Sequence, residues 1–408
     1  MSRKLGLLVL SLMLIISIIP TFAQDDVVLR YFTFSAAPDH LEDLDVIIDE
    51  FEAQNEGITI EVSTAPFADY FTLLQADVVS GDAPDVFELN YESFVTYAAN
   101  GTLLDISDML SGDAPYYPRA LEAFQYEGVQ LALPETFSTV LMFYNADLFD
   151  EAGVDYPTEE WTWDDATVAA EAITALGDDT WGIFQPVQFW EFYKKAAQNG
   201  DCEFFNEDMT ESTINSPACV ETLEMMMSFM DSGLMPTAAE LSGISDSELF
   251  LNGDVGMLVT GIWMFGAFAE ADFNWDVQIE PMINQHAHHF FANGVAVSAT
   301  TDHAEASAAW AEFLTASETA AQVRVDSAWE LPALNELSYF ESYLELTPPE
   351  NREAVFLALE SPVTPPVIER QNEMQDAVNG FITQFADGML TAQEALDQSK
   401  EAIDALIQ

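Results

Sequence analysis

The stretch "LPETFSTVLMFYNADLFDEAG", residues 133–153, decides how the fold of this chain is interpreted. Its apolar run predicts a β-strand at 139–144, and the residues after it predict a short helix at 146–151. The aromatic group Trp161-Thr162-Trp163 follows soon afterwards. A strand that combines Pro, Glu, Phe, Ser and a Tyr-Asn pair needs an explanation, and the surrounding sequence supplies it.

Strands and helices alternate before this stretch. Strands are predicted at 27–34, 58–64 and 85–90, and helices between them at 39–57 and 70–81. Gly57 and Gly81 end the two helices. This alternation is typical of a doubly wound α/β sheet.

The pattern returns in the second half of the chain. It predicts strands at 182–187 and 255–260, a second crossing strand at 290–301, and helices at 217–233 and 303–317. The last helix opens with a capping box, Thr391 to Glu394. A chain of 408 residues is long enough for two domains. We therefore expect two α/β lobes, with the Pro-rich segments 347–350 and 361–366 as connections between them.

The first residues are typical of a secretory signal. Arg3 and Lys4 precede an apolar segment that ends in small residues at Ala23, where we expect cleavage. The alternative is an uncleaved anchor helix, which Pro20 and the small residues disfavour. A lipid anchor would have no attachment point, because this segment holds no cysteine. We expect an exported protein.

The chain is very acidic. Its formal net charge is -61, and removing residues 1–23, with Arg3 and Lys4 but no acidic residue, leaves -63. Such a surface repels nucleic acid and anionic lipid, so neither is an expected partner. Two explanations stay open: a salty or mildly acidic milieu that relieves the self-repulsion, or a general drift of composition.

The two cysteines, Cys202 and Cys219, have sixteen residues between them. In an exported chain two cysteines predict one disulfide. Closing a loop of that size is worth roughly 3 kcal/mol. The alternative is a pair of free thiols.

No catalytic motif is present: there is no phosphate-binding glycine loop, no nucleophile elbow and no HExxH. We therefore expect a protein that is not an enzyme and has no cofactor. His286, His288 and His289 form the one metal-like cluster. We expect them in a loop, without a clear fourth ligand, so an incidental or structural role is favoured over a metal site.

Aromatic and polar residues gather where the predicted strands end and helices begin. In open α/β sheets the carboxyl ends of strands face the ligand. Aromatic faces beside amide, hydroxyl and carboxylate groups suit a polyhydroxyl ligand, although any single aromatic could instead belong to the core. These residues are Phe34, Ser35, Phe67, Tyr70, Glu88, Asn90, Phe137, Ser138, Phe189, Trp190, Glu191, Trp263 and Trp329.

Three segments resemble motifs of one family. They are "GDAPDVFELN" (81–90), "LALPETFSTVLMFYNADLFDEAGVDYPTEEWTWDD" (131–165) and "LFLNGDVGMLVTGIW" (249–263). In this order they resemble the extracellular solute-binding proteins of ABC importers, in the sugar-binding group that includes maltose-binding protein. The resemblance spans essentially the whole mature chain. Departures are Asp254 and Gly256, where Lys and Ala are commoner, and Trp329-Glu330, where a small residue is common before Leu-Pro.

The resemblance implies two lobes joined by a hinge. It implies a first lobe of 24–138 plus 295–347 and a second lobe of 139–294 plus 348–408. The opening stretch then crosses between the lobes, with 134–138 on the floor of the cleft. Trp161-Thr162-Trp163 would start a helix of the second lobe, with both Trp side chains packed rather than touching ligand.

The resemblance also implies a function: capture of a sugar or oligosaccharide outside the membrane, and delivery to an ABC permease by a monomer whose lobes close on the ligand. Two alternatives are a metal- or other small-solute-binding protein of the same fold, and a secreted carbohydrate-active enzyme that uses two carboxylates. The candidate ligand residues are Phe34, Ser35, Phe67, Tyr70, Glu88 and Asn90 in the first lobe, Phe137 and Ser138 at the hinge, Trp190, Glu191, Trp263, Asn293 and Gly294 in the second lobe, and Trp329 as a cap.

Overall fold

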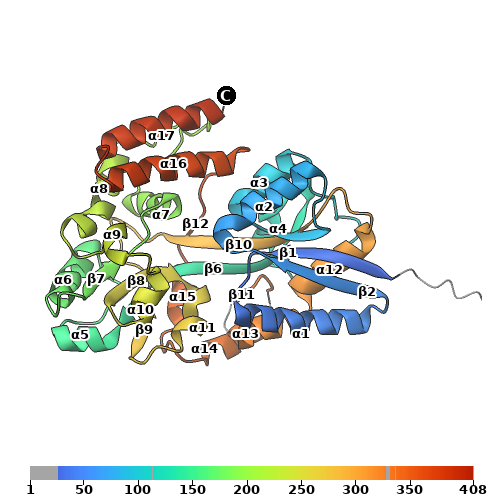
Figure 1. The fold of residues 1–408 in the computed structure, drawn as a ribbon, viewed down its shortest axis with the longest axis horizontal. Helices are drawn as coiled ribbons and strands as arrows, with labels where there is room; N and C mark the ends of the chain where they lie inside the picture. The colour runs from blue at the N-terminus through green and yellow to red at the C-terminus, as the bar shows by residue number, and fades with distance from the viewer. Residues whose placement is uncertain (1–25, 113, 328–330, 336, 408) are drawn as a thin grey trace, which may run out of the picture.

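The computed structural model describes residues 26–112, 114–327, 331–335 and 337–407. The predicted signal segment, 1–23, lies outside them. The described chain is α/β, with two lobes joined by long strands that run from one to the other (Figure 1). The main sheet has the strand order β2-β1-β3-β10-β6-β8-β7, so it continues through both lobes.

The first lobe is built around parallel strands, with β1 between β2 and β3. Helix α1 buries Leu44, Ile47, Ile48 and Phe51, the apolar face that its 3.6-residue spacing predicts. The elements are β1 (Val27–Thr33), α1 (Pro38–Gln54), β2 (Ile58–Thr64), α2 (Phe67–Ser80), β3 (Val86–Asn90), α3 (Tyr91–Ala99), α4 (Pro118–Ala123), the hairpin β4 (Gln125–Tyr126) and β5 (Val129–Gln130), α12 (Ala304–Ala316) and α13 (Glu318–Asp326).

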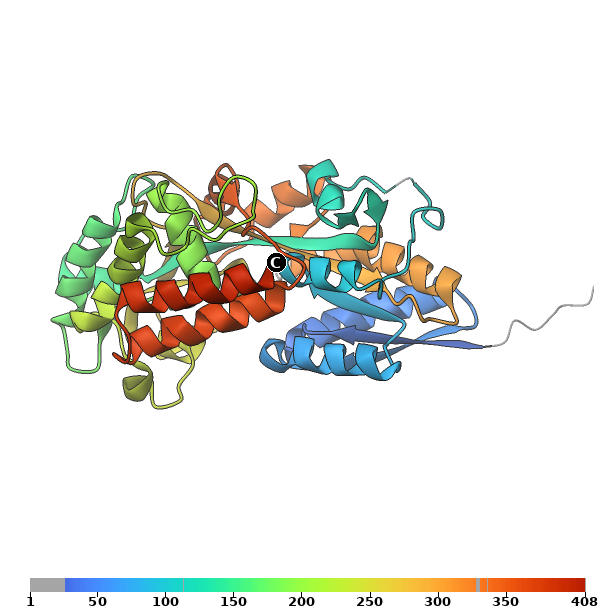
Figure 2. The ribbon, with the colours of Figure 1, turned by 90° about the horizontal axis from the view of Figure 1, so that it is seen from above.

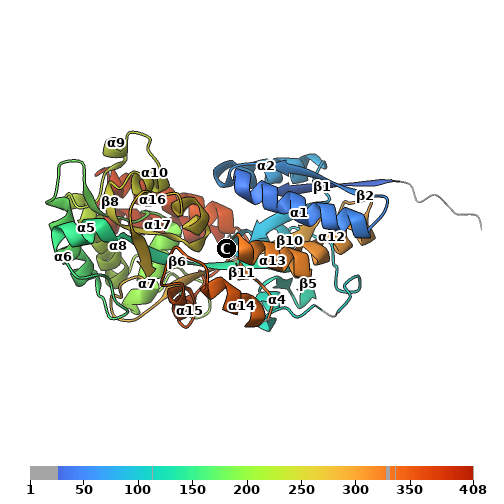
Figure 3. The same cartoon turned by 90° about the horizontal axis from the view of Figure 1, so that it is seen from below.

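The second lobe packs helices around β7, β8 and β9 (Figure 1). Helices α5 and α6 lie at the end of the molecule far from β1 and β2 (Figure 3). The last two helices of the second lobe, α16 and α17, lie side by side on the outside of the molecule (Figure 2). The elements are α5 (Ala146–Ala152), α6 (Trp163–Thr174), β7 (Trp181–Phe184), α7 (Phe189–Asn199), α8 (Pro217–Asp231), α9 (Ala238–Leu241), α10 (Asp246–Leu251), β8 (Val255–Gly261), η1 (Ile262–Met264), α11 (Phe265–Phe268), β9 (Trp275–Gln278), α15 (Glu353–Ala358), α16 (Gln371–Ala386) and α17 (Ala392–Leu406). Helix α14 (Leu337–Leu344) packs against α13 of the first lobe.

Two antiparallel strands, β6 (Ala132–Asn145) and β10 (His288–Val297), cross between the lobes. Strand β6 has fourteen residues and is therefore longer than the predicted strand at 139–144. All of its residues are buried. The register shifts between Asn293 and Gly294, opposite Pro134 to Thr136. This irregularity accommodates Pro134, which has no N–H for the ladder, and lets pairing begin earlier than the apolar pattern indicates.

The expected loop at the histidine cluster is wrong for two of its three members. His288 and His289 open β10, where they pair with Pro362 and Val363 of β12 (Pro362–Val363). Both side chains are buried. Pairing with a strand more than seventy residues later is a tertiary effect that local pattern does not contain.

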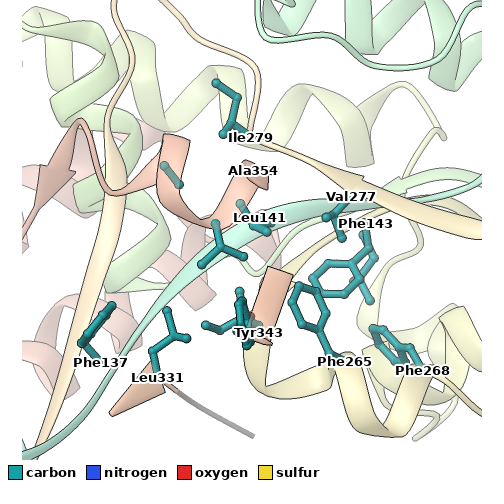
Figure 4. Packing of buried hydrophobic residues seen from close by; sticks show 14 of the residues in the cluster. Phe137, Leu141, Phe143, Phe265, Phe268, Val277, Ile279, Leu331, Tyr343 and Ala354 are labelled. Carbon is teal, nitrogen blue, oxygen red and sulfur yellow. The ribbon is translucent and has the colours of Figure 1, made fainter. Parts of the chain in front are cut away.

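The face of β6 that points away from α7 supports an apolar cluster. Phe137, Leu141 and Phe143 pack there with Phe265 and Tyr343, beside the short strand β11 (Leu331–Pro332) (Figure 4). The cluster joins residues from α11, α14 and α15 to the crossing strand.

Several local predictions are confirmed. Cys202 and Cys219 form a disulfide with their Cα atoms 4.7 Å apart. Thr391 and Glu394 form the predicted capping box of α17. Thr162 caps α6 in the same way, and Trp163 begins that helix with 5% of its surface exposed. Among the described helices, none has the length and apolarity needed to cross a membrane.

Candidate functional site

The alternation of side chains along β10 places its residues on two faces of the crossing strands. His289, Phe291 and Asn293 lie on one face, opposite Ser138 and Thr136 of β6. Nδ2 of Asn293 donates to Oγ1 of Thr136 at 3.3 Å. This face therefore carries both predicted polar candidates of the crossing strands, Ser138 and Asn293.

An aromatic wall stands on this face, and we define it as Trp190, Trp263, His289 and Phe291. The ring centre of Phe291 lies 3.9 Å from that of His289, 5.9 Å from that of Trp190 and 5.6 Å from that of Trp263. Both Trp side chains are partly exposed, so each keeps some ring surface available. Such surfaces stack on the C–H face of a sugar ring.

Local backbone geometry positions the two Trp residues. Trp190 lies in the first turn of α7, whose N-terminal Phe189 N–H donates to Oδ1 of Asn379 in α16 at 2.7 Å. Trp263 lies over Gly261 so closely that a Cβ there would be 2.0 Å from its ring. Gly261 thus lets the indole fold back onto the end of β8.

Glu92, in the first turn of α3, brings a carboxylate to the same place. Its Oε1 lies 3.5 Å from Nε2 of His289, a separation too long for a strong hydrogen bond. The other carboxylate oxygen and Nδ1 of His289 are buried without a hydrogen-bond partner. Buried polar atoms are nearly always paired in folded proteins, so these two atoms are suited to a ligand that brings hydroxyl groups.

The first lobe reaches the second next to Glu92. Oγ of Ser93 donates to Oδ1 of Asn372 in α16 at 3.2 Å. Asn90 holds the start of α3, since its side chain accepts from the N–H of Ser93 at 3.0 Å. Asn90 is also paired with Asn293 across β3 and β10. Candidate residues of both lobes therefore meet at one end of α3.

Other predicted candidates are engaged elsewhere in this structure. The Tyr70 hydroxyl is buried, 2.9 Å from the backbone oxygens of both Phe32 and Glu88. Burial is also the main cause that raises the pKa of Tyr70. Glu88 accepts from the side chain of Thr33 and, at 3.1 Å, from the N–H of Phe34. Both side chains thus tie β1 to β3.

Three more candidates are enclosed by protein atoms. A Cβ on Gly294 would lie 2.6 Å from the ring of Phe124. The ring that closely approaches this glycine is therefore a first-lobe side chain and not a ligand. Glu191 is fully buried, in ion pairs with Lys194 and Lys195. Phe137 lies in the apolar cluster of Figure 4 with 7% of its surface exposed.

The remaining first-lobe candidates lie close to Tyr70. The ring of Phe34 lies 5.3 Å from that of Phe67, which is 56% exposed. The backbone N–H of Ser35 donates to Oγ1 of Thr33 at 3.0 Å. These three candidates stay at the end of β1 and the start of α2. Trp329 lies outside the described residues.

Sequence reasoning missed Glu92, Phe291 and Asn372, and it assigned His289 to an incidental cluster. The signal for Glu92 was present, since Asn90 ends a strand and caps the next helix, and strand ends are where ligand groups gather. Asn372 carried no signal, because it meets Ser93 from 279 residues away.

The other face of the crossing strands has a different character. A pocket of about 290 Å³ lies there, and its lining is almost wholly apolar. Its residues are Tyr117, Ala120, Phe137, Phe290, Phe356, Leu359, Pro362 and Thr364. With so few polar groups this pocket suits hydroxyl-rich ligands less well than the aromatic wall does.

The histidines do not assemble a metal centre within the described part of the chain, where no group of three His, Cys, Asp or Glu side chains is arranged to hold an ion. The ring centres of His286 and His288 are 5.8 Å apart. Burial, together with the ammonium of Lys194, lowers the pKa of His288 to about 3.

Solved structures with the same fold are sugar-binding proteins. An ABC substrate-binding protein from Listeria monocytogenes, in complex with cycloalternan, is 45% identical and superposes with a TM-score of 0.90 over 93% of this chain and 99% of that one. A maltose/maltodextrin-binding domain from Bdellovibrio bacteriovorus bound to maltotriose is 17% identical, with a TM-score of 0.79 over 93% of this chain and 99% of that one.

Curated relatives are binding proteins as well. A galactooligosaccharide-binding protein from Bacillus subtilis (strain 168) is 23% identical over 86% of this chain and 83% of its own length. A binding protein from Brucella abortus (strain 2308) is 26% identical over 54% of this chain, and the match spans about half, 54%, of that relative. The family of bacterial extracellular solute-binding proteins matches residues 37–321. The chain belongs to this family of bacterial extracellular solute-binding proteins.

Proposed function

We propose that this protein captures an oligosaccharide outside the cytoplasmic membrane and delivers it to the permease of an ABC importer. The observation that carries the proposal is the aromatic wall beside the unpartnered polar atoms of Glu92 and His289. Stacking surfaces and free hydrogen-bonding groups together match the two sides of a sugar ring. The protein works as a monomer, without cofactor or catalysis, in the periplasm or outside the cell.

The ligand contacts both lobes. Trp190 and Trp263 stack on it from the second lobe, while Glu92, Asn90 and Ser93 reach it from the start of α3. Ser138 and Asn293 lie beneath it on the crossing strands. A ligand that touches both lobes favours the closed arrangement by its differential affinity for that state. Phe34, Ser35 and Phe67 extend the first-lobe side for a ligand of several sugar units.

The charge distribution supports an uncharged ligand. Each lysine or arginine whose side chain the structure describes is already committed to protein partners. Arg30 pairs with Asp82, Lys194 and Lys195 with Glu191 and Glu280, Arg324 with Glu135, Arg370 with Glu373 and Lys400 with Glu211 and Asp404, while Arg352 donates to the backbone oxygens of Leu346 and Pro348. A phosphate or carboxylate would meet Glu92 without a compensating cation, which is costly.

Cycloalternan is the first ligand to test, because a 45% identical structure holds it. A thermal-shift screen should compare it with maltotriose, galacto- and arabino-oligosaccharides, single sugars and sn-glycerol 3-phosphate, the last being the ligand in the name of a Brucella abortus relative that is 26% identical. A ligand at 100 times its Kd adds about 2.7 kcal/mol of stability. We expect a neutral oligosaccharide to give the largest shift. Stabilisation by metal ions alone, or hydrolysis of aryl glycosides, would contradict the proposal.

A further inference from the structure

The second lobe buries a ring of four charges, which we define as Glu191, Lys194, Lys195 and Glu280. Nζ of Lys194 lies 2.8 Å from Oε2 of Glu191 and also pairs with Oε1 of Glu280. Nζ of Lys195 lies 2.8 Å from Oε2 of Glu280 and also pairs with Oε1 of Glu191. Each ammonium therefore contacts both carboxylates, and all four side chains are fully buried.

Such a ring is poorly explained by stability alone. Taking four charges out of water is expensive, and apolar residues of similar size often stabilise a fold at least as well as a buried ion pair. The charge is also scarce, because the 408-residue chain contains only 10 Lys and Arg against 71 Asp and Glu. Two of those ten cations lie in this ring, at neighbouring positions of one helix.

The ring adjoins the aromatic wall at Trp190. Three of its members belong to α7, the helix that carries Trp190 in its first turn, and Glu280 follows β9. Nζ of Lys194 lies 5.5 Å from the ring centre of Trp190. A cation at this distance from an indole face attracts the ring quadrupole, most strongly where water is excluded.

The second lysine contacts a different indole. Nζ of Lys195 lies 3.9 Å from the ring centre of Trp163, which is buried in the core and donates through Nε1 to Gln198 at 2.9 Å. Lys194 and Lys195 thus share the same carboxylates and the same burial, yet only Lys194 acts on a residue of the aromatic wall.

We infer that Lys194, held in the ring of four charges by Glu191 and Glu280, positions Trp190 and keeps the indole in the orientation that stacks on the sugar. Glu280 fixes Lys194 from outside α7, so the orientation of Trp190 is tied to the segment that leads into β10. The inference rests on the proposed function, because it assigns Trp190 to the sugar site. Lys194 and Glu280 are positioning residues and do not touch the ligand.

The matched variants Lys194→Met and Lys195→Met test this assignment. Each removes one ammonium from the same ring and should destabilise the fold to a similar extent. Lys194→Met should weaken oligosaccharide binding about two- to thirtyfold, the range that a cation–π contact supports. Lys195→Met should leave the affinity per folded molecule unchanged. Equal losses of affinity in both variants would overturn the inference.

A spectroscopic readout follows the indoles without ligand. In protein labelled with 5-fluorotryptophan, the ¹⁹F resonances of Trp190 and Trp163 are assigned with Trp190→Phe and Trp163→Phe. Lys194→Met should shift the Trp190 resonance and Lys195→Met the Trp163 resonance. An unmoved Trp190 resonance in Lys194→Met would reject the positioning role even if affinity fell.

Two further comparisons separate a failure of this inference from a failure of folding or of the proposed function. If a single variant does not fold, the double variant Lys194→Met/Glu280→Gln is compared with Lys195→Met/Glu280→Gln. Each double variant removes one positive and one negative charge from the ring. If the unaltered protein binds none of the oligosaccharides, the proposed function fails, while the ¹⁹F comparison still reports whether Lys194 orients Trp190.

Discussion

Oε1 of Glu92 lies 3.5 Å from Nε2 of His289, although 197 residues separate them in the chain. Glu92 opens α3 of the first lobe, and His289 lies on β10, where the strand enters the second lobe. The contact therefore joins the two lobes at the aromatic wall. It places a buried carboxylate at the site where we propose that the ligand binds.

Glu92→Gln should weaken oligosaccharide binding by about tenfold, because an amide is a weaker acceptor for sugar hydroxyls than a carboxylate. Isothermal titration of the variant with the best ligand of the thermal-shift screen measures this. Glu50→Gln is the control, since Glu50 is exposed on α1 and accepts from the nearby Gln54. Equal affinities for Glu92→Gln and the control would remove Glu92 from the site.

Trp263→Ala should lower the affinity for sugar and leave the free energy of unfolding largely unchanged. Its ring is partly exposed in the aromatic wall, so its loss should weaken sugar binding by about 1–3 kcal/mol, roughly ten- to hundredfold. Trp310→Ala is the matched change in the first-lobe core, where the side chain is fully buried, and should instead cost about 3–5 kcal/mol of unfolding free energy. Melting temperatures and ligand titrations of both variants separate the two effects. A strongly destabilised Trp263→Ala with unchanged affinity would place Trp263 in the core.

Removing the disulfide should lower stability and spare affinity. Cys202 and Cys219 are buried in a second-lobe core cluster, and closure of the loop between them is worth about 3 kcal/mol. Cys202→Ser/Cys219→Ser should therefore unfold at lower denaturant concentration and bind sugar as before. In the unaltered protein, iodoacetamide should modify neither cysteine until a reductant is added. Modification of both without reduction would mean that the exported protein carries thiols.

Salt should stabilise this protein. The net charge is -61, and every described cationic side chain is committed to a protein partner, so most surface acids repel one another without compensation. The Debye length falls from about 30 Å at 0.01 M salt to about 3 Å at 1 M, which screens this repulsion. The melting temperature should rise steadily over that range. A flat or falling curve would mean that local partners already compensate the acids, and a salty milieu would no longer explain the composition.

His288 should make the fold acid-sensitive. Its pKa is lowered to about 3 in the folded state, from about 6.5 in the unfolded chain, because burial and Lys194 disfavour the charged ring. Between these two pH values the unfolded chain therefore binds more protons than the folded protein. The contribution of His288 to the stability of the folded protein is complete above pH 6.5 and is lost as the pH falls toward 3. His288→Gln removes it, so the variant should lose less stability than the unaltered protein between pH 8 and pH 5. Parallel losses in urea denaturation at the two pH values would contradict this.

The lobes themselves illustrate how far local pattern reaches. The strands at 27–34, 58–64 and 85–90 were predictable because apolar runs alternate with amphipathic helices, and β1, β2 and β3 lie within a residue of those limits. The disulfide followed from residue type and export alone. The lobe boundaries at 138/139 and 294/295 fall inside β6 and β10, and stay a prediction.

Composition and spacing determined the fold class, the succession of elements and the resemblance to solute-binding proteins, since all three are carried by short-range periodicity and ordered motifs. Only the tertiary structure decided which side chains meet. The register of β6 against β10 sets which face holds His289, Phe291 and Asn293, and a shift by one residue would reverse it. The packing of α3 and α16 then brings Glu92 and Asn372 to that face from distant parts of the chain. Pairings across such separations depend on how the two lobes pack against each other, and local sequence propensity does not determine that packing.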